Sequence, residues 1–416
     1  MDDGAVNVSG LSRDELAEIG PAMQAIVDQG LLSGIVTLVW RNGEIAQVTT
    51  NGKRDIAAGK PMERDSIFRI MSMTKPIASV AALMLMEEGK FALDDPITEW
   101  APEFADMRVL KDAEGPVDAT YPAPRAITFD DLFTHRSGLA YAFTGVGPIA
   151  HAYQKTLGDV LGANATPDAW MKALATLPLL YAPGERFQYG HSSDVLGFIV
   201  GRIAGKPFRE FLFERIFDPL GMVDTDFWIP PAKRDRTAMV YRLKGAHDLE
   251  LVAFPDRDAP PAFAGGSGGL VSTADDYLKF ARMLLADGEL DGVRLLQPET
   301  VKLMRTNRLT DAQRQIPFFG MPFWAGQGFG LGLSVIDDVE KQAWMGAGSN
   351  GAFSWPGAYG TWWRADPQEN MILIYLIQNA MELGPEAASQ LATGQRMAAQ
   401  AALPAFQNLA YAAAGR

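Results

Sequence analysis

Ser72-Met73-Thr74-Lys75 is the stretch that decides the fold, and it is the only Ser-x-x-Lys sequence among the 416 residues of the chain. Pro76 and the apolar residues 77–86 follow it, which predicts a buried helix that begins at or just before Ser72. Residues three apart lie on the same face of a helix, so Lys75 can reach the hydroxyl of Ser72. The backbone N–H of Ser72 would belong to the unpaired first turn, where it can donate to an anion. The tetrad alone is equally compatible with an ordinary serine cap beside a solvated lysine.

The composition excludes several kinds of site. The chain has no cysteine, which rules out a thiolate nucleophile, a disulfide framework, an iron–sulfur cluster and Cys-ligated zinc. Its four histidines show no metal-ligand spacing, so we expect neither a metal nor another cofactor. A formal net charge of −13 argues against nucleic acid and anionic membrane surfaces as partners. Because we find no basic and apolar leader and no apolar run of about 18 residues, we expect a cytoplasmic protein, and the sequence leaves its oligomeric state open.

Runs of β-branched and apolar residues predict strands near both ends of the chain. Asn42-Gly43 is a pair typical of a tight hairpin turn, and it separates the first two predicted strands. Helices are predicted outside these strands at each end of the chain. The predicted strands cover residues 34–40, 44–50, 358–365 and 371–378, and the predicted terminal helices cover residues 12–29 and 385–402.

We predict an α/β (α+β) fold in which one antiparallel sheet is built from both termini and flanked by helices. The sheet domain would comprise residues 1–90 and 265–416. Residues 91–264 show helical spacing interrupted by Pro- and Gly-rich connectors, and we predict that they form a mainly helical inserted domain.

A second serine, Ser267, lies in Gly265-Gly266-Ser267-Gly268-Gly269, which matches the Gly-x-Ser-x-Gly nucleophile elbow. That elbow needs a strand before the serine, a helix directly after it and a histidine later in the chain. A Pro-rich loop precedes Ser267, and no histidine follows His247. We therefore interpret the segment as a flexible Gly-rich turn that leads into a strand.

Further motifs occur in one order along the chain. They lie at residues 64–70, 132–139 (Leu-Phe-Thr-His-Arg-Ser-Gly-Leu), 181–184 (Tyr-Ala-Pro-Gly), 187–190 (Phe-Gln-Tyr-Gly), 219–222 (Pro-Leu-Gly-Met), 266–276 and 354–361 (Ser-Trp-Pro-Gly-Ala-Tyr-Gly-Thr). With the Ser-x-x-Lys tetrad they resemble the serine β-lactamase/penicillin-binding-protein-like family in its class C branch, and most of all its esterase members, the family VIII carboxylesterases. The resemblance extends over about residues 20–380. It implies a β-lactamase/DD-peptidase-like fold with the active site between the sheet domain and the helical insertion.

The resemblance implies roles for three side chains. Ser72 would be the acylated nucleophile, Lys75 its partner, and Tyr189 the counterpart of the tyrosine in the family's Tyr-x-Asn motif. A protonated lysine favours the phenolate form of a nearby tyrosine, and a phenolate can accept the serine proton. The backbone N–H groups of Ser72 and Ala358 would form the oxyanion hole.

The chain departs from the family pattern at the third motif. Trp355-Pro356-Gly357 stands where β-lactamases carry Lys-Thr-Gly, and an indole cannot pair with a substrate carboxylate as a lysine does. We therefore expect Trp355 and Gly357 to meet a neutral, partly apolar acyl or alcohol group. Pro356 removes one backbone donor from this edge, and a plain core position for Trp355 is the alternative.

Three further side chains are candidates for substrate contact. His191 stands where the family carries Asn, and either a contact to the substrate or to Tyr189, or a structural hydrogen bond, fits a histidine there. Tyr141 and Phe143 are loop aromatics that are candidates for an acyl pocket, with ordinary packing as the simpler alternative.

We predict a serine hydrolase that cleaves small-molecule carboxylic esters, with short acyl chains or aryl groups, through an acyl-enzyme on Ser72. Weak β-lactam hydrolysis is a secondary expectation. The enzymatic alternatives are a β-lactamase, a D-amino-acid amidase or peptidase, and an acyltransferase, which share the acyl-enzyme. A catalytically silent binding protein is the alternative outside enzymes, and the intact set of Ser72, Lys75 and Tyr189 argues against it.

Overall fold

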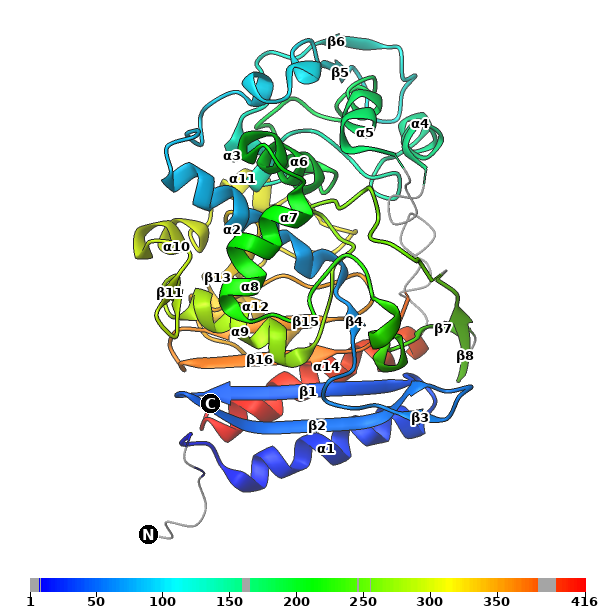
Figure 1. Cartoon of the computed structure of the whole chain (residues 1–416), viewed down its shortest axis with the longest axis vertical. Coiled ribbons are helices and arrows are strands. Elements are labelled where there is room, and N and C mark those ends of the chain that lie inside the picture. Colours follow the sequence, from blue (N-terminus) through cyan, green and yellow to red (C-terminus); the bar gives the residue numbers. More distant parts are fainter. Residues whose placement is uncertain (1–6, 8, 159–164, 245–246, 255, 381–393) are drawn as a thin grey trace.

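The structure is a computed structural model of the chain, and it describes residues 7, 9–158, 165–244, 247–254, 256–380 and 394–416. Figure 1 shows two layers of the fold, with a sheet and the terminal helices at one end and a largely helical region above them. In the part of the chain that is described, we find no helix with the length and apolar character that crossing a bilayer requires.

The centre of the fold is an antiparallel sheet in which the two ends of the chain lie side by side (Figure 1). β1 (Gly34–Arg41) pairs with β2 (Glu44–Asp55) on one side and with β16 (Met371–Leu376) on the other. Within the described residues this sheet has eight strands, in the order β12-β13-β14-β15-β16-β1-β2-β3. Its other strands are β3 (Lys60–Pro61), β12 (Gln327–Phe329), β13 (Ser334–Ile336), β14 (Phe353–Ser354) and β15 (Trp362–Asp366).

β1 is buried on both faces of the sheet, which explains why its sequence is a nearly continuous apolar run. Val39 packs with the terminal helices α1 (Arg13–Asp28) and α14 (Gly394–Ala413). Leu38 points to the opposite face and belongs to the larger core, which includes α9 (Ala274–Leu285). The predicted fold class, an antiparallel sheet built from both termini and flanked by helices, is confirmed.

The middle of the chain forms the helical region above the sheet in Figure 1. α2 (Thr74–Glu87) and α6 (Ser192–Ala204) pack against each other at its buried centre. One continuous hydrophobic core joins this region to the sheet, and the predicted domain boundaries at 90/91 and 264/265 stay a prediction. Its remaining helices are α3 (Phe129–Phe133), α4 (Pro148–Leu157), α5 (Pro167–Leu174), α7 (Phe208–Leu212) and α8 (Asp218–Leu220).

The strand predicted to start at residue 358 begins only at Trp362. Pro356 has no N–H to offer a neighbouring strand, and the chain turns directly after it. The Gly357 N–H donates to the Thr361 carbonyl at 2.7 Å, and the Gly360 N–H donates back to Gly357 at 3.0 Å. The predicted strand is therefore wrong over its first four residues, which form a tight loop.

Two other predictions need correction or completion. The hairpin of β7 (Val240–Lys244) and β8 (Asp248–Val252) was not predicted, because the charged residues of this segment resemble those of an exposed loop. The helix predicted over 385–402 falls partly on residues 381–393, which lie outside the described residues. Its described part, α14, continues to Ala413 because Phe406 and Tyr411 are buried in the cluster between the sheet and α1.

Candidate active site

Ser72 enters α2 through a single turn of 3-10 helix, Met71–Met73, so the regular helix begins later than predicted. The first residue of that turn has a left-handed backbone, with a φ of 49°, which costs a non-glycine residue about 1–2 kcal/mol. Side chains from two other segments hold the turn. Tyr277 donates to the carbonyl of the residue after Ser72 at 2.9 Å, and Thr361 donates to the Ile70 carbonyl at 3.1 Å. The strained turn is thus fixed on both sides of Ser72.

The structure brings Ser72, Lys75 and Tyr189 into direct contact. The Lys75 Nζ lies 3.0 Å from the Ser72 Oγ, and the Tyr189 hydroxyl donates to the same oxygen at 2.7 Å. Lys75 is 1% exposed, and its ammonium lies 4.6 Å from the centre of the Tyr189 ring. A buried cation beside both oxygens stabilises negative charge on either of them. The catalytic roles of these three residues stay predictions.

Trp355 packs against Tyr189, with ring centroids 5.6 Å apart. Its indole N–H donates to the Tyr189 hydroxyl at 3.2 Å, and the indole is buried. Tyr189 therefore accepts one hydrogen bond while it donates another to Ser72. Around this pair the structure gathers an aromatic cluster that includes Tyr141, Phe187, Phe323, Trp324 and Phe329.

Ser267 contacts Lys75 and Asp194 through its backbone. Its carbonyl accepts a hydrogen bond from Lys75 at 2.8 Å, and its N–H donates to Asp194 at 3.0 Å. The glycines before it allow this close approach, since a Cβ on Gly266 would lie 2.1 Å from the Ser193 carbonyl. The segment is a turn that leads into β9 (Val271–Ser272), as predicted, but packing holds it in place.

His191 and Asp194 form a buried pair at the start of α6. The His191 Nδ1 lies 2.9 Å from the Asp194 carboxylate, and both side chains are at most 2% exposed. The His191 ring also contacts the rings of Tyr141 and Trp170, at centroid distances of 4.5 and 5.1 Å. The pair thereby joins Ser267, and through it Lys75, to α6.

Tyr141 and Phe143 lead from this buried site toward the surface. Their rings stack at 4.9 Å, and Phe143 in turn faces the exposed Phe319 at 6.4 Å. Burial, reinforced by the charge of Asp194, raises the pKa of Tyr141 well above its usual value. Its hydroxyl therefore stays protonated, and it forms a hydrogen bond with the Ser267 side chain.

His135 is the other buried histidine of the site, and its ring lies 4.9 Å from that of Tyr189. Burial, and then the positive charge of Lys75, hold the pKa of His135 well below its usual range. The imidazole is therefore neutral. In the described residues it has no hydrogen bond to Ser72, so the proton acceptor nearest this serine comes from Lys75 or Tyr189.

The predicted oxyanion donors lie in two segments that are tied together. Gly357 fits against the 3-10 turn that carries Ser72, where a Cβ on Gly357 would lie 2.4 Å from the Ile70 carbonyl. The Gly357 N–H is already used within its own loop. The Ala358 N–H has no acceptor among the described residues, which leaves it available to an oxygen of the substrate.

Asp194→Ala is expected to lower the free energy of unfolding by about 3 kcal/mol, because it leaves the Ser267 N–H and the His191 ring nitrogen buried without partners. Denaturant unfolding measures this change. Asp275→Ala is the matched control, because Asp275 pairs with Arg64 at the surface and its loss is expected to cost at most about 1 kcal/mol. Equal losses in the two variants would contradict the structural importance of the buried pair.

Sequence reasoning found Ser72, Lys75 and Tyr189 but not the residues that hold them. No sequence motif indicated that Asp194 or the Ser267 carbonyl would belong to the site. The one available signal was the spacing of His191 and Asp194, three residues apart at a helix start, where the two side chains share a face.

Known proteins resemble this chain over most of its length. The family model described as Beta-lactamase matches residues 21–393. Protein Rv1367c of Mycobacterium tuberculosis is 51% identical over 95% of this chain and 98% of its own length. Esterase EstB of Burkholderia gladioli is 32% identical, over 88% of this chain and 92% of its own. The solved structure of "EstCE1, a hydrolase with promiscuous acyltransferase activity" superposes with a TM-score of 0.75 at 26% identity, and the match covers 94% of this chain and 98% of that one.

Proposed function

Because the chain belongs to the beta-lactamase family, with esterases among its relatives, we propose that it is a carboxylesterase that forms an acyl-enzyme on Ser72. The observation that carries the proposal is the shared contact of Lys75 and Tyr189 with the Ser72 Oγ, at 3.0 and 2.7 Å. Both distances are within the reach that proton transfer requires. Family membership places the protein in the serine hydrolase superfamily. The proposal adds the ester substrate and the acyl-enzyme on Ser72.

The first half of the reaction acylates Ser72. Its Oγ forms a bond to the ester carbonyl carbon, and its proton passes to the phenolate form of Tyr189. The carbonyl oxygen becomes an oxyanion, which the N–H groups of Ser72 and Ala358 stabilise. The ester C–O bond then breaks, Tyr189 gives the proton to the departing alkoxide, and the alcohol leaves.

The second half frees the enzyme. Water attacks the acyl carbon and gives a proton to Tyr189 as its oxygen bonds. The bond to Ser72 breaks, Ser72 recovers the proton, and the carboxylic acid departs. Throughout, Lys75 holds its positive charge next to both oxygens, and the Ser267 carbonyl fixes its ammonium.

Trp355 supports an ester over a β-lactam, because its N–H is bonded to Tyr189 and it offers no positive charge to a β-lactam carboxylate. The test is a comparison of kcat/KM for p-nitrophenyl esters of short acids with that for a chromogenic cephalosporin. We expect the esters to be the better substrates. A higher kcat/KM for the cephalosporin would replace the proposal with a β-lactamase.

Acyl transfer is the second candidate, and the promiscuous acyltransferase activity stated for EstCE1 favours it. It shares the acyl-enzyme and replaces water by an alcohol in the second half. Product analysis of an ester reaction with added short alcohol separates the two, since a transferase yields the new ester as its main product. A cytoplasmic location stays a prediction.

Trp355→Phe is expected to lower kcat for ester hydrolysis about tenfold with little change in KM, because the phenolate of Tyr189 loses a hydrogen-bond donor. Steady-state kinetics on p-nitrophenyl butyrate measures it. Trp344→Phe is the control, because Trp344 is 48% exposed and has no hydrogen bond to Tyr189 in the described part of the chain. A rise in KM with unchanged kcat would instead make Trp355 a contact for the substrate alone.

A further inference from the structure

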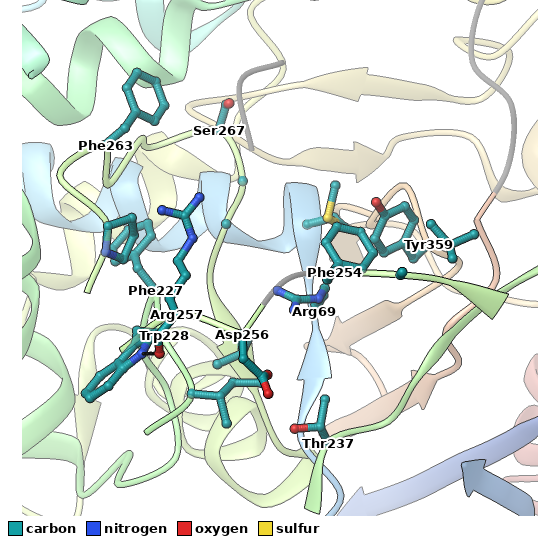
Figure 2. Close-up of a pocket in the computed structure, with 18 residues that line it drawn as sticks. Arg69, Phe227, Trp228, Thr237, Phe254, Asp256, Arg257, Phe263, Ser267 and Tyr359 are labelled. Carbon is teal, nitrogen blue, oxygen red and sulfur yellow. Dashed lines mark hydrogen bonds between the residues drawn. The ribbon is translucent and has the colours of Figure 1, made fainter. Parts of the chain in front are cut away.

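A cavity of about 400 Å³ opens beside the nucleophile turn (Figure 2). Met71 and Tyr359 both line it, and they are the neighbours in sequence of Ser72 and Ala358, whose N–H groups form the proposed oxyanion hole. Ser267, whose carbonyl binds Lys75, lines it too. The cavity therefore adjoins the two segments that carry the proposed oxyanion donors, where it is placed to receive one arm of a bound ester.

Five of the eighteen residues that line the cavity are aromatic. In Figure 2 they come from several separate segments, and the volume is that of a small-molecule site. Such walls bind an apolar or aromatic body. The aromatic lining residues are Phe227, Trp228, Phe254, Phe263 and Tyr359.

Arg69 is one of three charged residues that line the cavity, with Asp256 and Arg257. It leaves β4 (Phe68–Arg69) three residues before Ser72, and its guanidinium carbon lies 4.3 Å from the centre of the Phe254 ring. A guanidinium that stacks on a ring through its face keeps its N–H edge for an acceptor in the plane. No carboxylate of the described residues forms an ion pair with Arg69.

The surroundings leave the charge of Arg69 only partly balanced. Burial lowers the pKa of Arg69, and the attraction of Tyr359 and Asp256 opposes this effect only in part. The Asp256 carboxylate is 75% exposed and lies 3.8 Å from Arg234. A second cation, Arg257, lines the same cavity. An anion in the cavity would offset the cost of removing Arg69 from water.

We propose that Arg69 is a substrate-binding residue that pairs with a free carboxylate, so that the enzyme acts on esters that carry both a carboxylate and an apolar or aromatic body. This inference rests on the proposed esterase function. It also divides the two requirements of the site. Trp355 donates a hydrogen bond to Tyr189, and Arg69, which lines the cavity, supplies the positive charge that binds the substrate carboxylate.

The first test uses the wild-type enzyme with two pairs of esters. One pair places the charge in the alcohol part, 4-butyryloxybenzoate against 4-butyryloxybenzamide. The other places it in the acyl part, the mono-p-nitrophenyl ester of glutaric acid against that of glutaramic acid. We expect kcat/KM for the carboxylate to exceed that for the amide by about 10- to 100-fold in one pair, which identifies the arm that enters the cavity. No preference in either pair would overturn the inference.

The second test uses variants. Arg69→Gln is expected to reduce the preference for the carboxylate by about 10-fold or more, and Arg69→Lys to keep part of it, since a lysine retains the charge without the planar fork. Arg282→Gln is the matched control, because Arg282 also lies over a ring, that of Trp40 at 5.6 Å, but lines a separate cavity. An undiminished preference in Arg69→Gln would overturn the assignment of Arg69.

The two proposals fail in different ways. If Ser72 takes no acyl group and none of the four esters is hydrolysed, the proposed function fails and this inference with it. If each carboxylate ester is hydrolysed with the same kcat/KM as its amide partner, the esterase function stands and the carboxylate site alone is wrong. Since the wild-type comparison needs no variant, loss of folding in Arg69→Gln does not affect it.

Discussion

Ser72→Ala is expected to lower kcat/KM on p-nitrophenyl butyrate by about 10⁴-fold, because the acyl-enzyme cannot form without the hydroxyl. The substitution removes one oxygen and leaves the turn in place, since the bonds from Tyr277 and Thr361 involve other residues. Steady-state kinetics at matched enzyme concentration measures the loss, and a thermal unfolding midpoint close to that of the wild type shows that the fold is retained.

Ser267→Ala is the control that the chain itself offers. Alanine keeps the carbonyl that binds Lys75 and the N–H that binds Asp194, so we expect kcat/KM to stay within about tenfold of the wild type. The opposite pattern, with activity retained in Ser72→Ala and lost in Ser267→Ala, would make Ser267 the nucleophile.

Tyr189→Phe is expected to lower kcat about 10³-fold, because in the proposed mechanism the phenol oxygen, which contacts Ser72, moves the proton between Ser72, the leaving alcohol and water. The ring stays, so packing in the aromatic cluster and KM are expected to change little. The kcat and KM values for a p-nitrophenyl ester, measured over a range of pH, give both quantities.

Tyr153→Phe separates this effect from the loss of any buried hydroxyl. Tyr153 is also buried, and its oxygen accepts from the Ala140 N–H at 3.1 Å without a hydrogen bond to Ser72. We expect about 1 kcal/mol of lost stability and a kcat close to the wild-type value. If both variants lost kcat equally, Tyr189 would be a structural residue and Lys75 alone would be the base.

The sequence predicted the site residues that lie at a characteristic helical spacing from each other or within a family motif. Ser72 and Lys75 meet because they lie three residues apart at a helix start, and that geometry holds across the 3-10 turn. Tyr189 required the family resemblance, since no local rule brings residue 189 to residue 72. The sheet was predictable because β1 and β16 are both apolar runs beside turn residues.

The rest of the site depends on contacts that no short pattern encodes. The Ser267 carbonyl reaches Lys75 across 192 positions of sequence, and it does so as backbone, which carries no residue signature. The same Gly-rich segment was interpreted correctly as a turn, yet its glycines serve close packing on Ser193 rather than freedom of movement. Pro356 likewise gave a reason to doubt a strand edge, and the structure replaces that edge with a loop.

Trp355 and Arg69 show how the structure changes the expected substrate. The sequence suggested a neutral ester because an indole stands where relatives carry a lysine. In the structure the indole N–H donates to Tyr189, while Arg69, a partly buried arginine three residues before Ser72, lines the adjoining cavity. The proposed substrate therefore combines an apolar body with a carboxylate.

The most direct test of the central claim is mass spectrometry of the enzyme quenched in acid during turnover of p-nitrophenyl butyrate, followed by peptide mapping. We predict a single butyryl group on the peptide that contains Ser72. If Tyr189→Phe slows deacylation more than acylation, a larger fraction of that variant carries the butyryl group. A butyryl group on the peptide that contains Ser267, or turnover without any covalent intermediate in rapid-quench samples, would contradict the central claim.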